Sequence, residues 1–155
     1  MAGEFMMLLQ VAVAGLLGGV IGLERQQRSR PAGLRTHMIV AAASDVPILL
    51  GEQLARHFND GVLAEPLRTD PIRGLQAIVV GVSFLGAGTI INAGRNNHVR
   101  GLTTAASLLL TMAVGVAVAV GLYVLAVGAT FLTVAVLYGL RFLERKLPDK
   151  PDRKK

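Results

Sequence analysis

Residues 102–142 read LTTAASLLLTMAVGVAVAVGLYVLAVGATFLTVAVLYGLRF, with no charged side chain before Arg141. A transmembrane helix needs about 20 mostly apolar residues, because the hydrocarbon core of a bilayer is about 30 Å thick. One helix over the whole stretch would be about twice that length. Gly121 divides the stretch and permits a tight reversal of the backbone. We therefore predict two transmembrane helices, over about 102–120 and 122–142.

Three further apolar segments precede this pair, over about 5–23, 34–50 and 74–91. Each is close to the length that crosses a bilayer. The sequence therefore predicts an all-α, polytopic membrane helix bundle of about five transmembrane helices, forming one domain over 1–143. Residues 144–155 are a basic tail with too little apolar content to fold alone.

The composition argues against most soluble functions. Of the 155 residues, 52% are hydrophobic and 17% are charged, whereas soluble domains carry about 25% charged residues. Cysteine is absent, and the three histidines lie too far apart for a local metal-ligand pair. No nucleophile–base pair is visible. We expect no enzyme activity, no catalytic residue, no resident metal and no cofactor, with Mg²⁺ left open as a ligand or signal.

The net charge of +6 has its explanation in the membrane. Thirteen of the 16 basic residues lie in segments 24–37, 92–100 and 141–155. Lysine and arginine collect on the cytoplasmic side of membrane proteins. The N-terminus is therefore predicted outside and the C-terminus in the cytoplasm. No aromatic residues alternate with the basic ones to stack on bases, so we expect no nucleic-acid partner.

An internal similarity appears when the chain is shifted by 68 residues. Leu17-Gly18 falls on Leu85-Gly86, Gly33-Leu34 falls on Gly101-Leu102, and Thr36 falls on Thr104. Two interpretations stay open: a tandem repeat of a helical hairpin, or chance matches between small residues. In membrane transporters with repeats, the functional site lies between them.

The glycines of the apolar segments suggest close helix packing. Small residues let the backbones of membrane helices approach each other, which is our interpretation of Gly18, Gly22, Gly86, Gly88 and Gly101. Nucleotide binding is a weak alternative, because no strand precedes the glycines and no Gly-Lys-Ser/Thr follows them.

Polar residues gather at the predicted cytoplasmic helix ends. A free helix N-terminus favours an anion, a carboxylate or a lipid phosphate. Two interpretations are open: a polar cluster that lines a cytoplasmic vestibule, or plain anchoring and helix capping at the interface. The candidate residues are Glu24, Arg25, Arg35, Thr36, His37, Asn92, Thr103 and Thr104.

The third predicted helix has a standard start. Asp70 suits the N-cap and Pro71 the first helical position. Arg73 can pair with Asp70, and Gln76 can bond a neighbouring helix. Helix capping alone can explain this helix-start motif, which consists of Asp70, Arg73 and Gln76.

Asp45 is an acid within the second predicted helix, about 16 Å from its start. An intramembrane carboxylate suggests a proton or ion pathway by default. A neutral, protonated carboxyl group is an alternative, as is a short helix that places Asp45 near the outer interface.

Taken together, the motifs resemble the MgtC/SapB family of bacterial membrane proteins, in the minimal form without a C-terminal soluble domain. The match runs in order over about residues 15–125. The motifs are Gly22-Leu23-Glu24-Arg25, Ala32-Gly33-Leu34-Arg35-Thr36-His37, Asp70-Pro71-x-Arg73, Phe84-Leu85-Gly86-Ala87-Gly88-Thr89-Ile90 and Val99-Arg100-Gly101-Leu102-Thr103-Thr104-Ala105-Ala106.

The resemblance implies a multi-pass protein of the bacterial inner membrane. It implies links to growth at low magnesium and, in pathogens, to virulence through survival inside macrophages. It further implies a regulator that acts on other membrane proteins, including the ATP synthase. The Ser44-Asp45-Val46-Pro47 stretch departs from the uniformly apolar family pattern, so the resemblance does not support Asp45 as a family site.

Three hypotheses follow for the function. The first is a regulator that contacts partner proteins in the bilayer through faces rich in small residues. The second is a transporter or channel for Mg²⁺ or protons, suggested by the acids and the repeat. The third is a homo-oligomeric scaffold that binds lipid through its basic tail.

Overall fold

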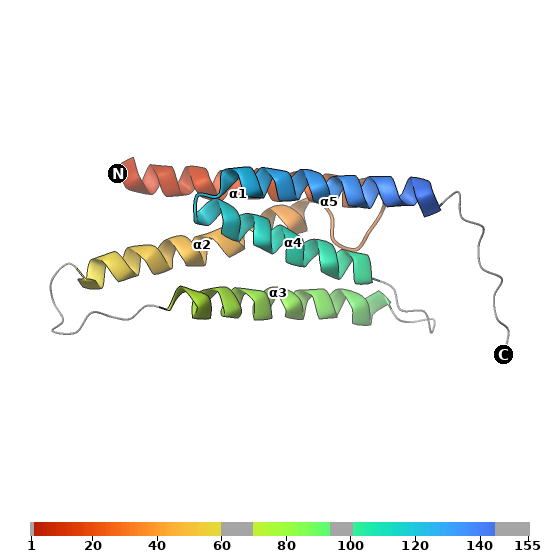
Figure 1. The fold of residues 1–155 in the computed structure, drawn as a ribbon. Helices are drawn as coiled ribbons and strands as arrows, with labels where there is room; N and C mark the ends of the chain where they lie inside the picture. Colours follow the sequence, from red (N-terminus) through yellow and green to blue (C-terminus); the bar gives the residue numbers. More distant parts are fainter. Residues whose placement is uncertain (1, 60–69, 94–100, 145–155) are drawn as a thin grey trace.

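In a computed structural model, which describes residues 2–59, 70–93 and 101–144, the chain is all-helical over the described part (Figure 1). The five helices run alternately up and down. Their bounds are α1 Ala2–Gln27, α2 Leu34–Asn59, α3 Pro71–Ala93, α4 Leu102–Ala119 and α5 Tyr123–Glu144. The prediction of a polytopic helical bundle is confirmed. The basic tail falls outside the described residues, except for Glu144.

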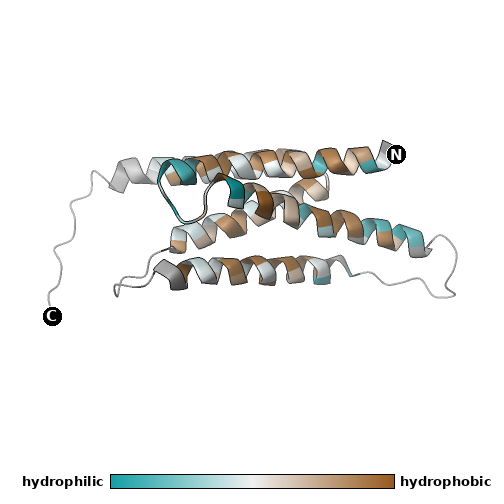
Figure 2. Ribbon diagram, turned by 180° about the vertical axis from the view of Figure 1, so that it is seen from behind, coloured by the Kyte–Doolittle hydropathy of each residue, from teal (hydrophilic) through white to brown (hydrophobic). Residues whose placement is uncertain are grey.

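Four helices are long and apolar enough to cross a membrane: Gly3–Gln27, Leu34–His57, Ile72–Ile90 and Leu102–Ala119. In α5 the apolar stretch Tyr123–Gly139 is shorter. Figure 2 shows apolar residues along the helix bodies and hydrophilic residues mainly toward the helix ends. The chain is thus a membrane protein with at least four candidate spans, and the fifth span remains a prediction.

The second helix is longer than the sequence indicated. It continues through Pro47 and ends at Asn59 rather than near Leu50. An ion pair between Glu52 and Arg56, one helical turn apart, supports the added turns. Residues 51–59 therefore continue α2 beyond its apolar part.

The turn between α4 and α5 shows how Gly121 reverses the chain. Gly121 has a left-handed backbone, with φ of 78°. Its N–H donates to the Val118 carbonyl at 2.9 Å, and the Leu122 N–H donates to the Ala117 carbonyl at 2.8 Å. These two bonds form a Schellman motif, which closes a helix on a glycine.

The core lies where α4 meets the α1–α2 hairpin. Its buried members are Ala14, Ile21, Ala41, Val114, Ala117, Val118 and Ala126. Most are small, which lets the helix backbones come close. Within the described part of the chain, α3 packs only on α2 and α4, and it lies at one edge of the bundle (Figure 1).

The geometry supports a repeat at an offset of 68 residues. Helix α2 begins at Leu34 and α4 begins at Leu102, which are equivalent positions. A Cβ built on Gly18 would meet the His37 carbonyl oxygen at 2.5 Å, and a Cβ built on Gly86 would meet the Ala105 Cβ at 3.3 Å. Position 37 is equivalent to position 105. The two hairpins therefore cross at equivalent glycines, Gly18 and Gly86.

Candidate functional site

Two glycines of α1 bring the first hairpin together. A Cβ on Gly22 would lie 2.8 Å from the Leu34 Cα and 2.9 Å from the Gly33 carbonyl oxygen. With Gly18 against His37, these contacts leave no room for a side chain between α1 and the start of α2. The close approach buries the polar residues at this end of the bundle.

The other candidate packing glycines behave differently from one another. A Cβ built on Gly86 would lie 3.3 Å from the Ala105 Cβ of α4, which is slightly tighter than an ordinary contact. Gly101 has φ of 91°, and a Cβ there would lie 2.7 Å from the Thr89 carbonyl oxygen, so this position requires glycine. Around Gly88 there is open space, so the structure places no helix contact there among the described residues.

Arg25 connects α1 to the start of α4. It is 3% exposed, and its Nη2 donates to the Thr104 Oγ1 at 2.9 Å. A buried guanidinium needs partners, because an unpaired charge in an apolar interior is unfavourable. The hydroxyl of Thr104 supplies one of them.

His37 connects α2 to α4 from a fully buried position. Its Nδ1 lies 3.0 Å from the Gly33 carbonyl oxygen, and its Nε2 lies 3.1 Å from the Ser107 Oγ. The carbonyl can only accept, so Nδ1 carries a proton. Nε2 then accepts from the Ser107 hydroxyl in a neutral ring, or donates to Ser107 in a charged ring.

Ser107 can serve both states of His37. Its hydroxyl also lies 2.8 Å from the Thr104 carbonyl oxygen, to which it can donate. When His37 is charged, its Nε2 donates to the Ser107 oxygen, and the Ser107 hydroxyl can donate to the Thr104 carbonyl. When His37 is neutral, the Ser107 hydroxyl donates to Nε2 instead. The cluster of Arg25, His37, Thr104 and Ser107 therefore joins three helices through hydrogen bonds.

Glu24 lies beside this cluster and forms an ion pair with Arg28, which is four residues later and just past the end of α1. The guanidinium of Arg28 also lies 5.1 Å from the ring centroid of Tyr138 in α5, a cation–π contact. In this region, two buried atoms have no hydrogen-bond partner within the described residues: Glu24 Oε2 and Arg25 Nε. These atoms leave the cluster one acceptor and one donor short of full satisfaction.

The structure brings together only part of the predicted cytoplasmic set. Glu24, Arg25, His37 and Thr104 are buried. Arg35, Thr36 and Thr103 are exposed, as interfacial anchors would be. Asn92 lies in α3, but its side chain falls outside the described residues.

Three residues of this region were missed by the sequence argument. They are Ser107, Arg28 and Gln26, whose Oε1 accepts from the Leu34 N–H at 3.2 Å and so caps α2. Ser107 lies three residues after Thr104, on the same face of a helix. That spacing is the signal that would have found it.

Asp45 lies in the middle of α2 and is fully buried. Neither carboxylate oxygen has a hydrogen-bond partner among the described residues. The second helix is not short, as one alternative for Asp45 required, because α2 continues to Asn59. Asp45 is separate from the cluster, because it lies eight positions after His37 along α2, a rise of about 12 Å.

The start of α3 has the expected geometry. Asp70 accepts from the Ile72 N–H at 3.0 Å, as an N-cap does. Arg73 Nε lies 3.6 Å from the second oxygen of Asp70, on the surface. Gln76 is exposed and makes no hydrogen bond to a described residue.

A family model described as the MgtC family matches residues 11–146. The chain belongs to the MgtC family. The resemblance drawn from the sequence motifs is thereby confirmed. No solved structure matches the chain.

Several characterised or named proteins share this MgtC region. The chain is 34% identical to the "Putative magnesium transporter YhiD" of Escherichia coli (strain K12), over 97% of this chain and 66% of YhiD. It is 42% identical to protein MgtC of Brucella abortus (strain 2308), over 88% of this chain and 52% of that protein. It is 32% identical to protein SapB of Bacillus subtilis (strain 168), over 95% of this chain and 62% of SapB. The chain thus spans between half and two thirds of the length of these relatives.

For this MgtC-family protein, the site is a helix-joining polar cluster rather than an ion cage. Among the described residues, no group of three or more His, Cys, Asp and Glu side chains gathers to hold a metal ion. The acid beside the cluster, Glu24, already pairs with Arg28. Its chemistry is hydrogen bonding between α1, α2 and α4.

Proposed function

We propose that this chain is a non-catalytic regulator of the bacterial inner membrane that contributes to adaptation to low magnesium or intracellular stress. It acts by contacting other membrane proteins, of which the ATP synthase is one candidate. Membership of the MgtC family and the magnesium-related name of YhiD support the physiological setting. The observation that carries the contact mechanism is the outward face of α3.

That face presents residues spaced four apart along α3. Ile72, Val80 and Phe84 are 63%, 69% and 79% exposed, and Gln76 lies between them in the same row. The hydrocarbon chains of lipids can cover the apolar members, but hydrocarbon offers no hydrogen bond to an amide. A partner helix would satisfy Gln76, because polar side chains bond across helices in membranes.

The polar cluster supports the same interpretation. Its buried hydrogen bonds connect α1 and α2 to α4. Helix α3 is not part of this hydrogen-bonded set of helices, and most of its surface is exposed. A helix at the edge of the bundle, packed on helices that are joined in this way, is well suited to bind a partner.

A site-specific crosslinking experiment tests this proposal. A photoreactive amino acid replaces Val80 on α3 or, as a matched control, Leu16 on α1, which is 64% exposed. We expect the Val80 variant to capture a discrete membrane protein in cells grown at low magnesium, and the Leu16 variant to capture none. A capture pattern that is the same for both positions, or a capture of lipid alone, would contradict the proposal.

Transport of Mg²⁺ or protons is the second candidate, and Asp45 is the observation that favours it. A fully buried carboxyl group without a protein partner is a default sign of an ion or proton pathway in a membrane helix. Flux into proteoliposomes is compared for the wild type, Asp45→Asn and Glu24→Gln. Flux that Asp45→Asn abolishes would establish transport, whereas no flux above empty vesicles would exclude it for the purified chain.

A further inference from the structure

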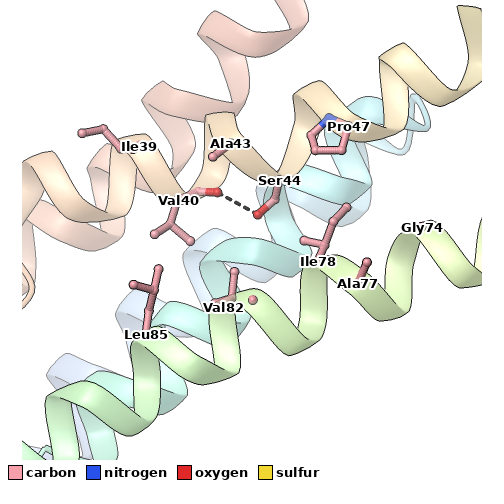
Figure 3. A pocket seen from close by; sticks show the side chains of 11 residues that line it. Ile39, Val40, Ala43, Ser44, Pro47, Gly74, Ala77, Ile78, Val82 and Leu85 are labelled. Carbon is pink, nitrogen blue, oxygen red and sulfur yellow. Dashed lines mark hydrogen bonds between the residues drawn. The ribbon is translucent and has the colours of Figure 1, made fainter.

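An open groove runs between α2 and α3, with a volume of about 490 Å³ (Figure 3). Both helices line it with small and aliphatic residues, and α2 adds Pro47. Its lining includes Gly74, Ala77, Gly81, Leu85, Val40 and Pro47. The hydroxyl in the lining, Ser44, already donates to the Val40 carbonyl at 2.7 Å. The groove therefore suits an apolar ligand.

The length of the groove matches one leaflet of a bilayer. From Gly74 to Leu85 it follows α3 for eleven residues, which is about 16 Å at the helical rise. The hydrocarbon core is about 30 Å thick, so half of it is about 15 Å. The groove begins at the first turn of α3 and ends near the middle of that helix.

The volume of the groove fits a small apolar ligand. At about 490 Å³, it falls in the range of small-ligand sites, about 300–1,000 Å³. An extended hydrocarbon chain matches its length and its apolar lining.

A cation lies next to the groove lining in the first turn of α3. Arg73 immediately precedes Gly74, and its side chain is 86% exposed. Its contact with Asp70 is long, at 3.6 Å, and Asp70 also accepts from the Ile72 N–H. The guanidinium can therefore receive a second anion, and phosphate is the anion that its planar donors match.

We propose that the α2–α3 groove binds one acyl chain of an anionic phospholipid, with the lipid phosphate at Arg73. The predicted orientation places this lipid in the outer leaflet. The bound chain fills the space where α2 and α3 do not meet, and so holds α3 beside the rest of the bundle. This lipid site goes beyond the regulatory function and does not depend on it.

Photolabelling in nanodiscs tests the acyl-chain site. The full chain is reconstituted with phosphatidylglycerol that carries a diazirine in its acyl chain, and labelled residues are mapped by mass spectrometry. Gly81→Leu fills the groove, and Gly128→Leu on α5 is the matched control, because neither glycine has a neighbour within 4 Å of a built Cβ. We expect labels concentrated on the groove residues, reduced at least fivefold by Gly81→Leu and unchanged by Gly128→Leu.

The headgroup contact is tested with Arg73→Gln and with Arg35→Gln, a control at an exposed arginine of the opposite end. We expect the wild type to label more strongly from phosphatidylglycerol than from phosphatidylcholine. Arg73→Gln should remove that preference, and Arg35→Gln should keep it. Labels that are spread equally over the groove and α5, labels unchanged by Gly81→Leu, or a protein captured in the groove would overturn the proposal.

Discussion

The α1–α2 and α3–α4 hairpins are related by an offset of 68 residues and cross at equivalent glycines, yet they differ in how tightly they close. In the first, a Cβ built on Gly18 or Gly22 would lie within 3 Å of the α2 backbone or of the loop before it, and charged residues are buried at this end. In the second, a Cβ built on Gly86 would lie 3.3 Å from the Ala105 Cβ, and Gly74, Gly81 and Gly88 have open space around them. The first hairpin is closed by backbone contact, whereas the second leaves open space beside α3.

The largest effect on stability is expected when the equivalent glycines Gly18 and Gly86 are each replaced by alanine. Gly18→Ala places a Cβ 2.5 Å from the His37 carbonyl oxygen and should lower the free energy of unfolding by about 1–3 kcal/mol or more. Gly86→Ala meets Ala105 at 3.3 Å and should change it by less than about 1 kcal/mol, because helix propensity offsets slight crowding. Thermal unfolding in detergent measures both. Equal effects would show that the two crossings are equally tight.

A smaller effect is expected at the hydrogen bond that joins the first hairpin to α4. Thr104→Val removes the partner of the buried Arg25 guanidinium and should cost about 1–3 kcal/mol of stability. Thr103→Val, at the neighbouring exposed position, is the control and should be near neutral. Thr104→Ser should restore most of the loss because it keeps the hydroxyl. A neutral Thr104→Val would mean that Arg25 finds another partner.

The loss at Ser107 should be smaller again. Ser107→Ala removes the hydrogen bond to His37 Nε2 and should cost about 1 kcal/mol. Ser83→Ala in α3 is the control, since Ser83 is exposed and should have little effect. If both alanine variants unfold at the same temperature as the wild type, His37 does not hold α4 through Ser107.

The least effect on stability is expected at the outer end of the second hairpin. Arg73→Gln removes an exposed 3.6 Å pair with Asp70, and such pairs contribute about 0–1 kcal/mol. Its unfolding in detergent should therefore match the wild type within about 1 kcal/mol. A larger loss would assign Arg73 to the support of α3 itself rather than to its surface.

The sequence predicted the helices well because apolar length, the property that defines a transmembrane helix, can be seen directly along the chain. Apolar length predicted the helices, and the Gly-Leu pairs at 33–34 and 101–102 marked the starts of α2 and α4. It failed at the end of α2, because helix formation continues past the apolar residues when an ion pair such as Glu52–Arg56 supports it. Of the cytoplasmic polar set, the sequence did not indicate which members are buried: Glu24, Arg25, His37 and Thr104 are, whereas Arg35, Thr36 and Thr103 are exposed.

The sequence by itself determined a membrane protein of the MgtC family, built from helices of alternating direction. Only the tertiary structure decided which residue of each similar pair turns inward: Arg25 but not Arg35, Thr104 but not Thr103, Gly86 but not Gly88. The physical reason is that membrane helices are apolar on every side, so their periodicity does not mark the inner face as it does in soluble proteins. That face is set by which backbones approach most closely.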